Sequence, residues 1–384
     1  MKKLFSILLV LALCLSMIST AFAATHPSEN APADEWERFA DSIRNFKSYE
    51  EVAEAYKIAA DKYSEYVAEE IFYFGPASSC YKKAIELFEY EKMYDKALEC
   101  YEALGDVAYV CEHYQEAITA FSKAKEIADD LSIDDNHKSV LFEKLGDSYL
   151  ALENYNDAAS EYLHAIDAVD SSREGYAALC LKYAKALEAE GSENDPDREE
   201  GIGRAFETAA GEFLAIGSYE EAVASMKSAA EHFDKADRKQ YSKVAYFTVI
   251  AALAQAGKTD MAVPLCFEAY EAYGADKTSA ALFTNIVAPY YDGIKDYSSA
   301  ALAYSNAGDC YKETGDKDLA KACYQEAAEY YEKAGDAEKA NAMKQLAGVG
   351  SILSEGNIKI IIPILIVIVV ILVALIVNKR KKQG

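Results

Sequence analysis

Residues 304–327 read YSNAGDCYKETGDKDLAKACYQEA. Tyr304 opens a pattern in which small or aromatic residues return at offsets of 3, 4 and 7, the spacing of one helical face. After the turn-forming residues around Gly315, a second such face follows at offsets of 16, 20 and 23. Small residues at offsets 4 and 16 let two antiparallel helices approach closely, and the aromatic residues fill the space between neighbouring hairpins. The stretch therefore predicts one hairpin of two helices.

The same frame returns along most of the chain. Clear copies start at Trp36, Tyr101, Phe142 and Tyr304, and weaker copies start at Tyr81, Phe206, Tyr246, Thr284 and Tyr324. Where two starts lie only 20 residues apart, the second helix of one hairpin is also the first helix of the next. One hairpin cannot bury its apolar faces alone, so the hairpins must stack. The sequence therefore predicts an all-α solenoid of antiparallel helical hairpins over residues 34–347.

The widest gap between copies, 64 residues from Phe142 to Phe206, predicts an extra helix over 176–189 and an acidic loop over 191–201. Asp195, Asp197 and Glu199 alternate as in a calcium-binding loop. Glu200 stands where such a loop needs glycine, so a solvated acidic loop is the favoured interpretation.

The repeating pattern closely resembles the tetratricopeptide repeat family, and its helix spacing is loosely similar to that of the soluble NSF attachment proteins, which are adaptors with the same kind of repeat. The first resemblance implies that the residue at offset 5 of each frame faces a concave groove that binds a protein or peptide. The acidic residues at that offset, and thus the predicted partner-binding residues, are Asp41, Glu86, Asp106, Asp147, Asp309 and Glu329. We expect a basic partner; the alternative is that these are solvated residues of an acidic body.

Both ends of the chain have the composition of targeting segments. Residues 1–23 read as a secretory signal peptide, with cleavage expected after Ala23 and an uncleaved anchor as the alternative. Residues 360–377 carry no charge, which predicts a membrane-spanning helix over 358–378. The basic tail 379–384 then stays in the cytoplasm and the body lies outside, held by a short tether over 348–357. A sorting signal that is cut and replaced is another interpretation of this end.

The charge of the chain limits its partners. All 64 acidic residues lie within residues 25–357, together with all but seven of the 39 basic ones, which gives that body a net charge of −32. Such a surface repels phosphate, so no nucleic-acid partner is expected.

No pattern of catalytic or metal-binding residues stands out in the sequence. The five histidines are scattered and form no paired motif, so we expect no enzyme activity, metal, cofactor or small-molecule substrate. The odd number of cysteines in the mature chain argues against a disulfide framework, and several precede a tyrosine on a helix face, which predicts small packing residues.

These observations predict a single-pass protein of the cell membrane, a scaffold for protein–protein interaction at the cell surface. The alternative is an adaptor similar to the soluble NSF attachment proteins, acting in the assembly or trafficking of membrane complexes.

Overall fold

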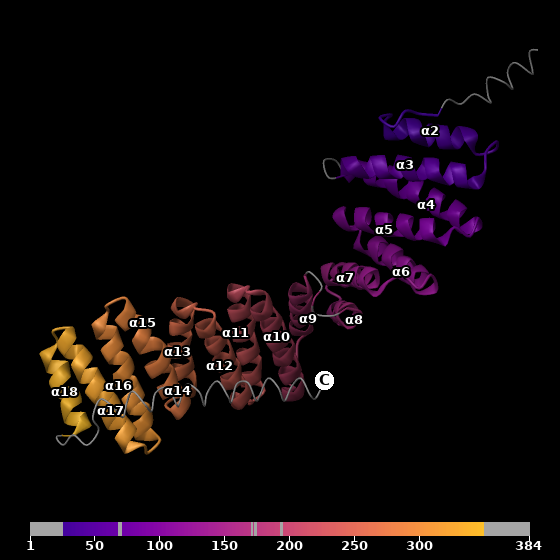
Figure 1. Cartoon of the computed structure of the whole chain (residues 1–384). Coiled ribbons are helices and arrows are strands. Elements are labelled where there is room, and N and C mark those ends of the chain that lie inside the picture. The colour runs from indigo at the N-terminus through magenta and orange to yellow at the C-terminus, as the bar shows by residue number, and fades with distance from the viewer. Residues whose placement is uncertain (1–25, 68–70, 170–171, 173–174, 193–194, 349–384) are drawn as a thin grey trace, which may run out of the picture. The chain divides into compact units, whose positions relative to one another are not determined.

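The computed structural model describes residues 26–67, 71–169, 172, 175–192 and 195–348. Every regular element in these ranges is a helix, so the predicted all-α repeat fold is confirmed (Figure 1). Within the same ranges, no helix combines the length and the apolar character that a membrane span needs. The predicted signal peptide (1–23), membrane helix (358–378) and basic tail (379–384) lie outside the described residues, as does the tether after Gly348.

The chain divides into two compact units, Met1–Gly191 and Ser192–Gly384. In the first unit each helix packs mainly against the helices before and after it, as the stacked hairpins require (Figure 1). Its helices are α2 (Ala33–Ile43), α3 (Tyr49–Val67), the 3₁₀ turn η1 (Ile71–Tyr73), α4 (Phe74–Tyr90), α5 (Tyr94–Val110), α6 (Tyr114–Asp130), α7 (Asp135–Ala151), α8 (Tyr155–Asp167) and α9 (Tyr176–Glu190).

The second unit repeats this arrangement with one irregular segment. Its helices are α10 (Pro196–Ile216), α11 (Tyr219–Lys235), α12 (Lys239–Gln255), α13 (Thr259–Tyr273), α14 (Lys277–Leu282), the π-helix η2 (Phe283–Val287), α15 (Ala288–Gly293), α16 (Tyr297–Glu313), α17 (Lys317–Lys333) and α18 (Ala337–Ala347). The predicted frame start at Thr284 falls inside the π-helix, where Thr284 itself is buried. The hairpin predicted from residues 304–327 is confirmed as α16 and α17.

The close helix approach predicted from the small residue at offset 4 is confirmed at three hairpins. Gly308 lies under the ring of Tyr324, and a Cβ atom added at Gly308 would meet the Tyr324 Cε1 atom at 2.6 Å. The same holds for Gly146 under Tyr162, also at 2.6 Å. Gly105 lies still closer under the ring of Phe121. In each hairpin the residue at offset 4 thus leaves room for the ring at offset 20, and only glycine gives that room.

Several turns between helices contain a residue in the left-handed backbone conformation that is not a glycine. Gly315 has the expected positive φ, 85°, between α16 and α17. Charged residues occupy the same position in other turns, among them Glu112 at φ 62° and Glu153 at φ 59°. A side chain in this region crowds the following carbonyl, so these turns carry strain that a glycine would relieve.

The prediction of an acidic loop over 191–201 is wrong for residues 196–201, which are helical. Helix α10 begins at Pro196, which needs no amide donor in the first turn, and the Asp195 carboxylate caps the helix by accepting from the Asp197 amide at 3.0 Å. Glu199, expected to be solvated, is only 9% exposed.

A buried histidine accounts for the position of Glu199. The Glu199 Oε2 atom lies 2.6 Å from Nδ1 of His232 on α11, and the Ser192 hydroxyl donates to the other carboxylate oxygen. His232 also stacks on Phe206. Burial disfavours the Glu199 carboxylate, but the bonds from Ser192 and His232 prevail and hold the pKa of Glu199 below its usual value. The contact joins α10 to α11 across 33 residues, a separation at which no local spacing predicts it.

The cysteines are packing residues, as predicted. All seven in the described ranges are buried free thiols: Cys80, Cys100, Cys111, Cys180, Cys266, Cys310 and Cys323. Burial raises the pKa of Cys266 to about 12, so its thiolate is scarcely populated at neutral pH.

Alanine at Gly308 tests the close contact between helices. We expect Gly308→Ala to lower the free energy of unfolding by about 1–3 kcal/mol, because the new Cβ displaces the buried Tyr324 ring. Gly211→Ala is the matched control: Gly211 also lies inside a helix, but an added Cβ there meets no atom within 4 Å. That variant should gain up to about 1 kcal/mol. Urea denaturation of the two variants compares them, and equal effects would contradict the packing role of Gly308.

Strain in the turns is tested by a reciprocal exchange. Glu153→Gly should raise the free energy of unfolding by about 1 kcal/mol, because glycine reaches φ 59° without crowding. Gly315→Ala should lower it by a similar amount, because it places a Cβ at φ 85°. Chemical denaturation measures both changes, and a loss of stability in Glu153→Gly would refute the strain.

Candidate functional site

The predicted groove residues at offset 5 prove to be part of the repeat packing in several hairpins. The hydroxyl of Tyr162 donates to Asp147 at 2.7 Å, and the hydroxyl of Tyr324 donates to Asp309 at 2.7 Å. Tyr56 donates to Asp41 in the same way. In each case the tyrosine stands fifteen residues after the aspartate, on the following helix. The pairing satisfies the hydroxyl of a ring that is otherwise buried.

In the first unit a lysine of the next helix completes this contact. We call the three side chains an acid–ring–lysine set, made of a carboxylate, the aromatic ring fifteen residues later, and a lysine over that ring. The sets are Asp41, Tyr56 and Lys83; Asp106, Phe121 and Lys144; and Asp147, Tyr162 and Lys182. The lysine nitrogen lies 4.8, 5.5 and 5.8 Å from the ring centre and 3.8, 2.7 and 2.7 Å from the carboxylate, in that order.

The ionisation of these groups follows from burial and pairing. Burial raises the pKa of the Tyr162 hydroxyl, and the bond to the Asp147 carboxylate raises it further. Burial opposes the charge of Lys182, yet its contacts with Asp147 and Glu143 outweigh that cost, so the pKa of Lys182 lies above its usual value. The pairing therefore favours the charged form of Lys182, and each set holds three consecutive helices together.

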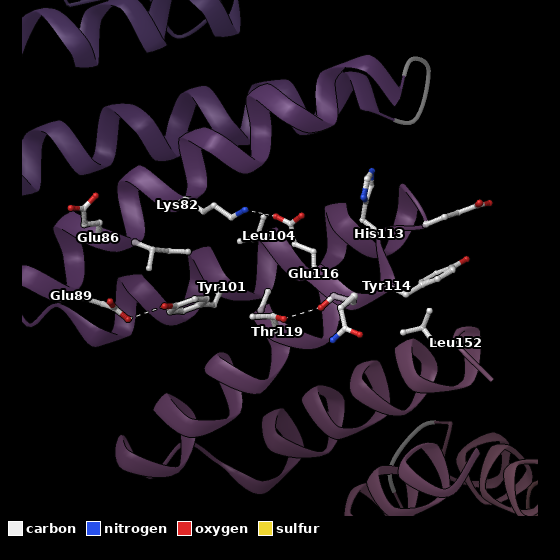
Figure 2. Close-up of a pocket in the computed structure, with 14 residues that line it drawn as sticks. Lys82, Glu86, Glu89, Tyr101, Leu104, His113, Tyr114, Glu116, Thr119 and Leu152 are labelled. Carbon is white, nitrogen blue, oxygen red and sulfur yellow. Dashed lines mark hydrogen bonds and ion pairs between the residues drawn. The ribbon is translucent and has the colours of Figure 1, made fainter. Parts of the chain in front are cut away.

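A cavity of about 770 Å³ lies on the first unit, over α4, α5 and α6 (Figure 2). The apolar part of its lining comes from Ile85, Leu104, Ala120 and Leu152. Its polar lining residues are Lys82, Glu86, Glu89, Tyr101, Glu112, His113, Tyr114, Gln115, Glu116 and Thr119. Of the predicted partner-binding residues, the cavity contains Glu86 alone.

Within the cavity, two of the four carboxylates have partners in the chain. Lys82 donates to Glu116 at 2.6 Å, and the Tyr101 hydroxyl donates to Glu89 at 3.0 Å, as the dashed lines in Figure 2 show. Burial disfavours the Glu116 carboxylate, but the bonds from Lys82 and Ser78 prevail and keep its pKa below the usual value. Burial, together with the bond to Glu89, raises the pKa of Tyr101 to about 12.

The other two carboxylates are free. The side chains of Glu86 and Glu112 form no hydrogen bond or ion pair with the residues that the structure describes. Since Lys82 balances only Glu116, the cavity keeps an excess of negative charge above an apolar floor. The arrangement suits a ligand that is positively charged at one end and apolar beside it.

The remaining predicted site residues are spread over both units. Glu329 is exposed on α17, and Asp309 lies on α16 against Tyr324. None of the other five lines the large cavity, and binding by these residues stays a prediction. The frame overlooked Glu89, Glu112 and Tyr114, because they stand at other offsets or in a turn. In the described residues, no group of three or more metal-ligating side chains lies together.

A smaller cavity of about 320 Å³ lies between α2 and α3, beside Trp36, Phe39 and Ile58. Its acidic residues include Glu50 and Glu54, and both are paired with Lys96, at 2.9 and 2.5 Å. The excess charge of the larger cavity is therefore the stronger indication of a binding site.

Replacing an acidic residue with alanine distinguishes a carboxylate that stabilises the fold from one that has no partner in the described residues. Asp147→Ala should lower the free energy of unfolding by about 1–3 kcal/mol, because it removes the acceptor of the buried Tyr162 hydroxyl and the partner of Lys182. Glu86→Ala should change it by less than about 0.5 kcal/mol, because Glu86 is exposed and unpaired. Thermal and urea unfolding measure both; a large loss in Glu86→Ala would show that Glu86 is structural.

The comparisons with known proteins agree with the repeat frame. Residues 301–334, on α16 and α17, match the model of the tetratricopeptide repeat. No curated protein sequence matches the chain. The chain is similar to a putative kinesin light chain with nearly identical TPR-like repeats from Podosopora anserina, at 12% identity and a TM-score of 0.38, over 56% of this chain and 99% of that one.

Two further solved structures are similar over more of this chain. One is the TPR2AB domain of yeast Sti1 in a complex with pHSP90, at 18% identity and a TM-score of 0.33, over 77% of this chain and 97% of that one. The other is aspartyl phosphate phosphatase F from Bacillus subtilis, at 17% identity and a TM-score of 0.30, over 85% and 80%. Residues 301–334 thus match one tetratricopeptide repeat, and the same frame of small and aromatic residues returns in the hairpins before it.

Proposed function

We propose that this protein is a membrane-anchored scaffold whose helical repeats bind a protein or peptide partner outside the cytoplasm. The observation that carries the proposal is the cavity over α4, α5 and α6, which is acidic, partly apolar and open to solvent through exposed Glu86 and Glu112. Stacked helical repeats use extended surfaces of this kind for binding. The activity proposed is binding, with no chemical step and no cofactor.

The membrane location rests on the sequence. The uncharged run 360–377 is long enough to span a bilayer, and the basic residues after it favour a cytoplasmic tail. The signal-like residues 1–23 favour export of the body. A body with a net charge of −32 is repelled by anionic lipids, so a tether after Gly348 would hold it near the membrane while leaving its acidic face free for a partner.

The alternative function is that of an adaptor similar to the soluble NSF attachment proteins, acting on membrane complexes from the cytoplasmic side. It is supported by the spacing of the tyrosine-rich and alanine-rich helices. The two proposals place the body on opposite sides of the membrane, so topology discriminates between them.

Protease treatment of intact cells tests this topology. With an epitope tag after Gly384, we expect added proteinase K to degrade the body while a short tagged fragment survives until the membrane is permeabilised. The physical reason is that basic residues beside a span stay in the cytoplasm. A cytoplasmic protein probed in the same samples controls for lysis. A body that is protected in intact cells would refute the outward orientation and favour the adaptor.

Cross-linking of the full-length chain in its native membrane tests the scaffold itself. A photoreactive residue in place of exposed Thr119, on the cavity wall, should cross-link to a defined protein or peptide that mass spectrometry identifies. The same residue at exposed Leu346, on the other unit, is the control position. Absence of any specific product from the cavity position would count against the scaffold proposal.

A further inference from the structure

The acid–ring–lysine sets of the first unit show what this fold places against a carboxylate and a neighbouring ring. In all three sets the carboxylate comes from one helix, the ring from the next helix and the lysine from the helix after that. The carboxylate precedes the ring by fifteen residues each time. An ammonium in this position is held by the negative charge and by the face of the ring.

Helices α4, α5 and α6 contain the first two members of a fourth set. Glu86 on α4 precedes Tyr101 on α5 by the same fifteen residues, and both line the large cavity. Glu89, one turn after Glu86, accepts the Tyr101 hydroxyl at 3.0 Å and adds a second carboxylate beside the ring (Figure 2). The acid and the ring are thus in place on the wall of an open cavity.

Among the described residues, the lysines on α6 and in the cavity lining that could complete this set are paired with other carboxylates. On α6, Lys123 pairs with Glu126 at 2.5 Å and Lys125 pairs with Glu161 at 3.1 Å. Lys125 also lies over the ring of Phe142, 4.7 Å from its centre. Lys82, the basic residue of the cavity lining, pairs with Glu116. No lysine or arginine of the described residues is paired with Glu86 or lies over Tyr101.

From this geometry we infer that the cavity binds a lysine or arginine side chain of a protein partner, with the cation between the Tyr101 ring and the carboxylates of Glu86 and Glu89. The apolar floor beside them, which includes Ile85 and Leu104, receives the methylene groups of that side chain and a neighbouring apolar residue. The inference rests on the proposed binding function and names the chemistry that its partner must carry.

Peptide binding to the full-length chain in mild detergent tests the inference. The probe is an end-blocked, fluorescently labelled peptide of alanine, leucine and serine with one central lysine; companion peptides carry arginine or glutamine at that position. Fluorescence anisotropy should show binding of the lysine and arginine peptides, about tenfold weaker binding of the glutamine peptide, and weakening as salt rises. Equal binding of the lysine and glutamine peptides, or no binding of either basic peptide at about 1 mM, would overturn the inference.

Variants locate the cation within the cavity. Glu86→Gln combined with Glu89→Gln should weaken binding of the lysine peptide about tenfold, and the amide at position 89 still accepts from Tyr101. Tyr101→Phe should keep the affinity, whereas Tyr101→Leu should reduce it, because only the latter removes the ring. Glu91→Gln is the control for one charge removed outside the cavity, to be compared with Glu86→Gln alone, since Glu91 is exposed just after α4 and outside the cavity lining. An equal effect of Glu91→Gln would mean that overall charge causes the binding, which overturns the inference.

The cross-linked partner separates this inference from the proposed function. If the Glu86→Gln, Glu89→Gln variant is folded by circular dichroism and no longer gives the cross-link, both stand. If that variant still gives the same product at the same yield, the scaffold proposal stands and the inferred cation site does not.

Discussion

The contact between a glycine of one helix and an aromatic ring of the next is the constraint on which three of the hairpins depend. Gly308 under Tyr324, Gly146 under Tyr162 and Gly105 under Phe121 each leave no space for a Cβ atom. This contact sets how closely the two helices approach each other. Their separation in turn determines where the tyrosine hydroxyl lies relative to the preceding helix. The carboxylate one residue after Gly146 and Gly308 is therefore within reach of that hydroxyl.

Acidic residues at offset 5 of the repeat frame consequently have two different roles. At Asp147 the carboxylate accepts a hydrogen bond from Tyr162 and pairs with Lys182, so it stabilises the fold. At Glu86 the residues that the structure describes provide no such lysine, and the carboxylate lines a cavity instead. The difference arises on the neighbouring helix, where Lys123 and Lys125 are bonded to other glutamates. The high acidity of the body thus includes many charges that are already compensated.

The fold was largely predictable because its determinants are local. The offsets of 3, 4 and 7 identify helix faces, and Gly308 and Tyr324 stand within one hairpin, so a single stretch contains the whole contact. The site was predictable only in part. Glu86 follows from the frame, but Glu112 lies in a turn, and which carboxylates are free depends on lysines some 35 to 42 residues away. The Glu199–His232 contact could not be predicted for the same reason, because its two residues stand 33 positions apart on the two helices of a long hairpin.

The acid–ring–lysine sets also bear on how the first unit comes apart. In a linear array, stability is the sum of what each repeat contributes and what each junction contributes. Lys83, Lys144 and Lys182 each fasten a helix to the hairpin before it, so they strengthen junctions rather than single repeats. Losing one hairpin exposes the ring and the carboxylate of its predecessor, which makes fraying from an end unfavourable. The sets connect α2 to α4 and α5 to α9, which favours cooperative unfolding within each of these two stretches. No set of this kind joins α4 to α5 in the residues that the structure describes, and there the packing of apolar side chains holds the helices together.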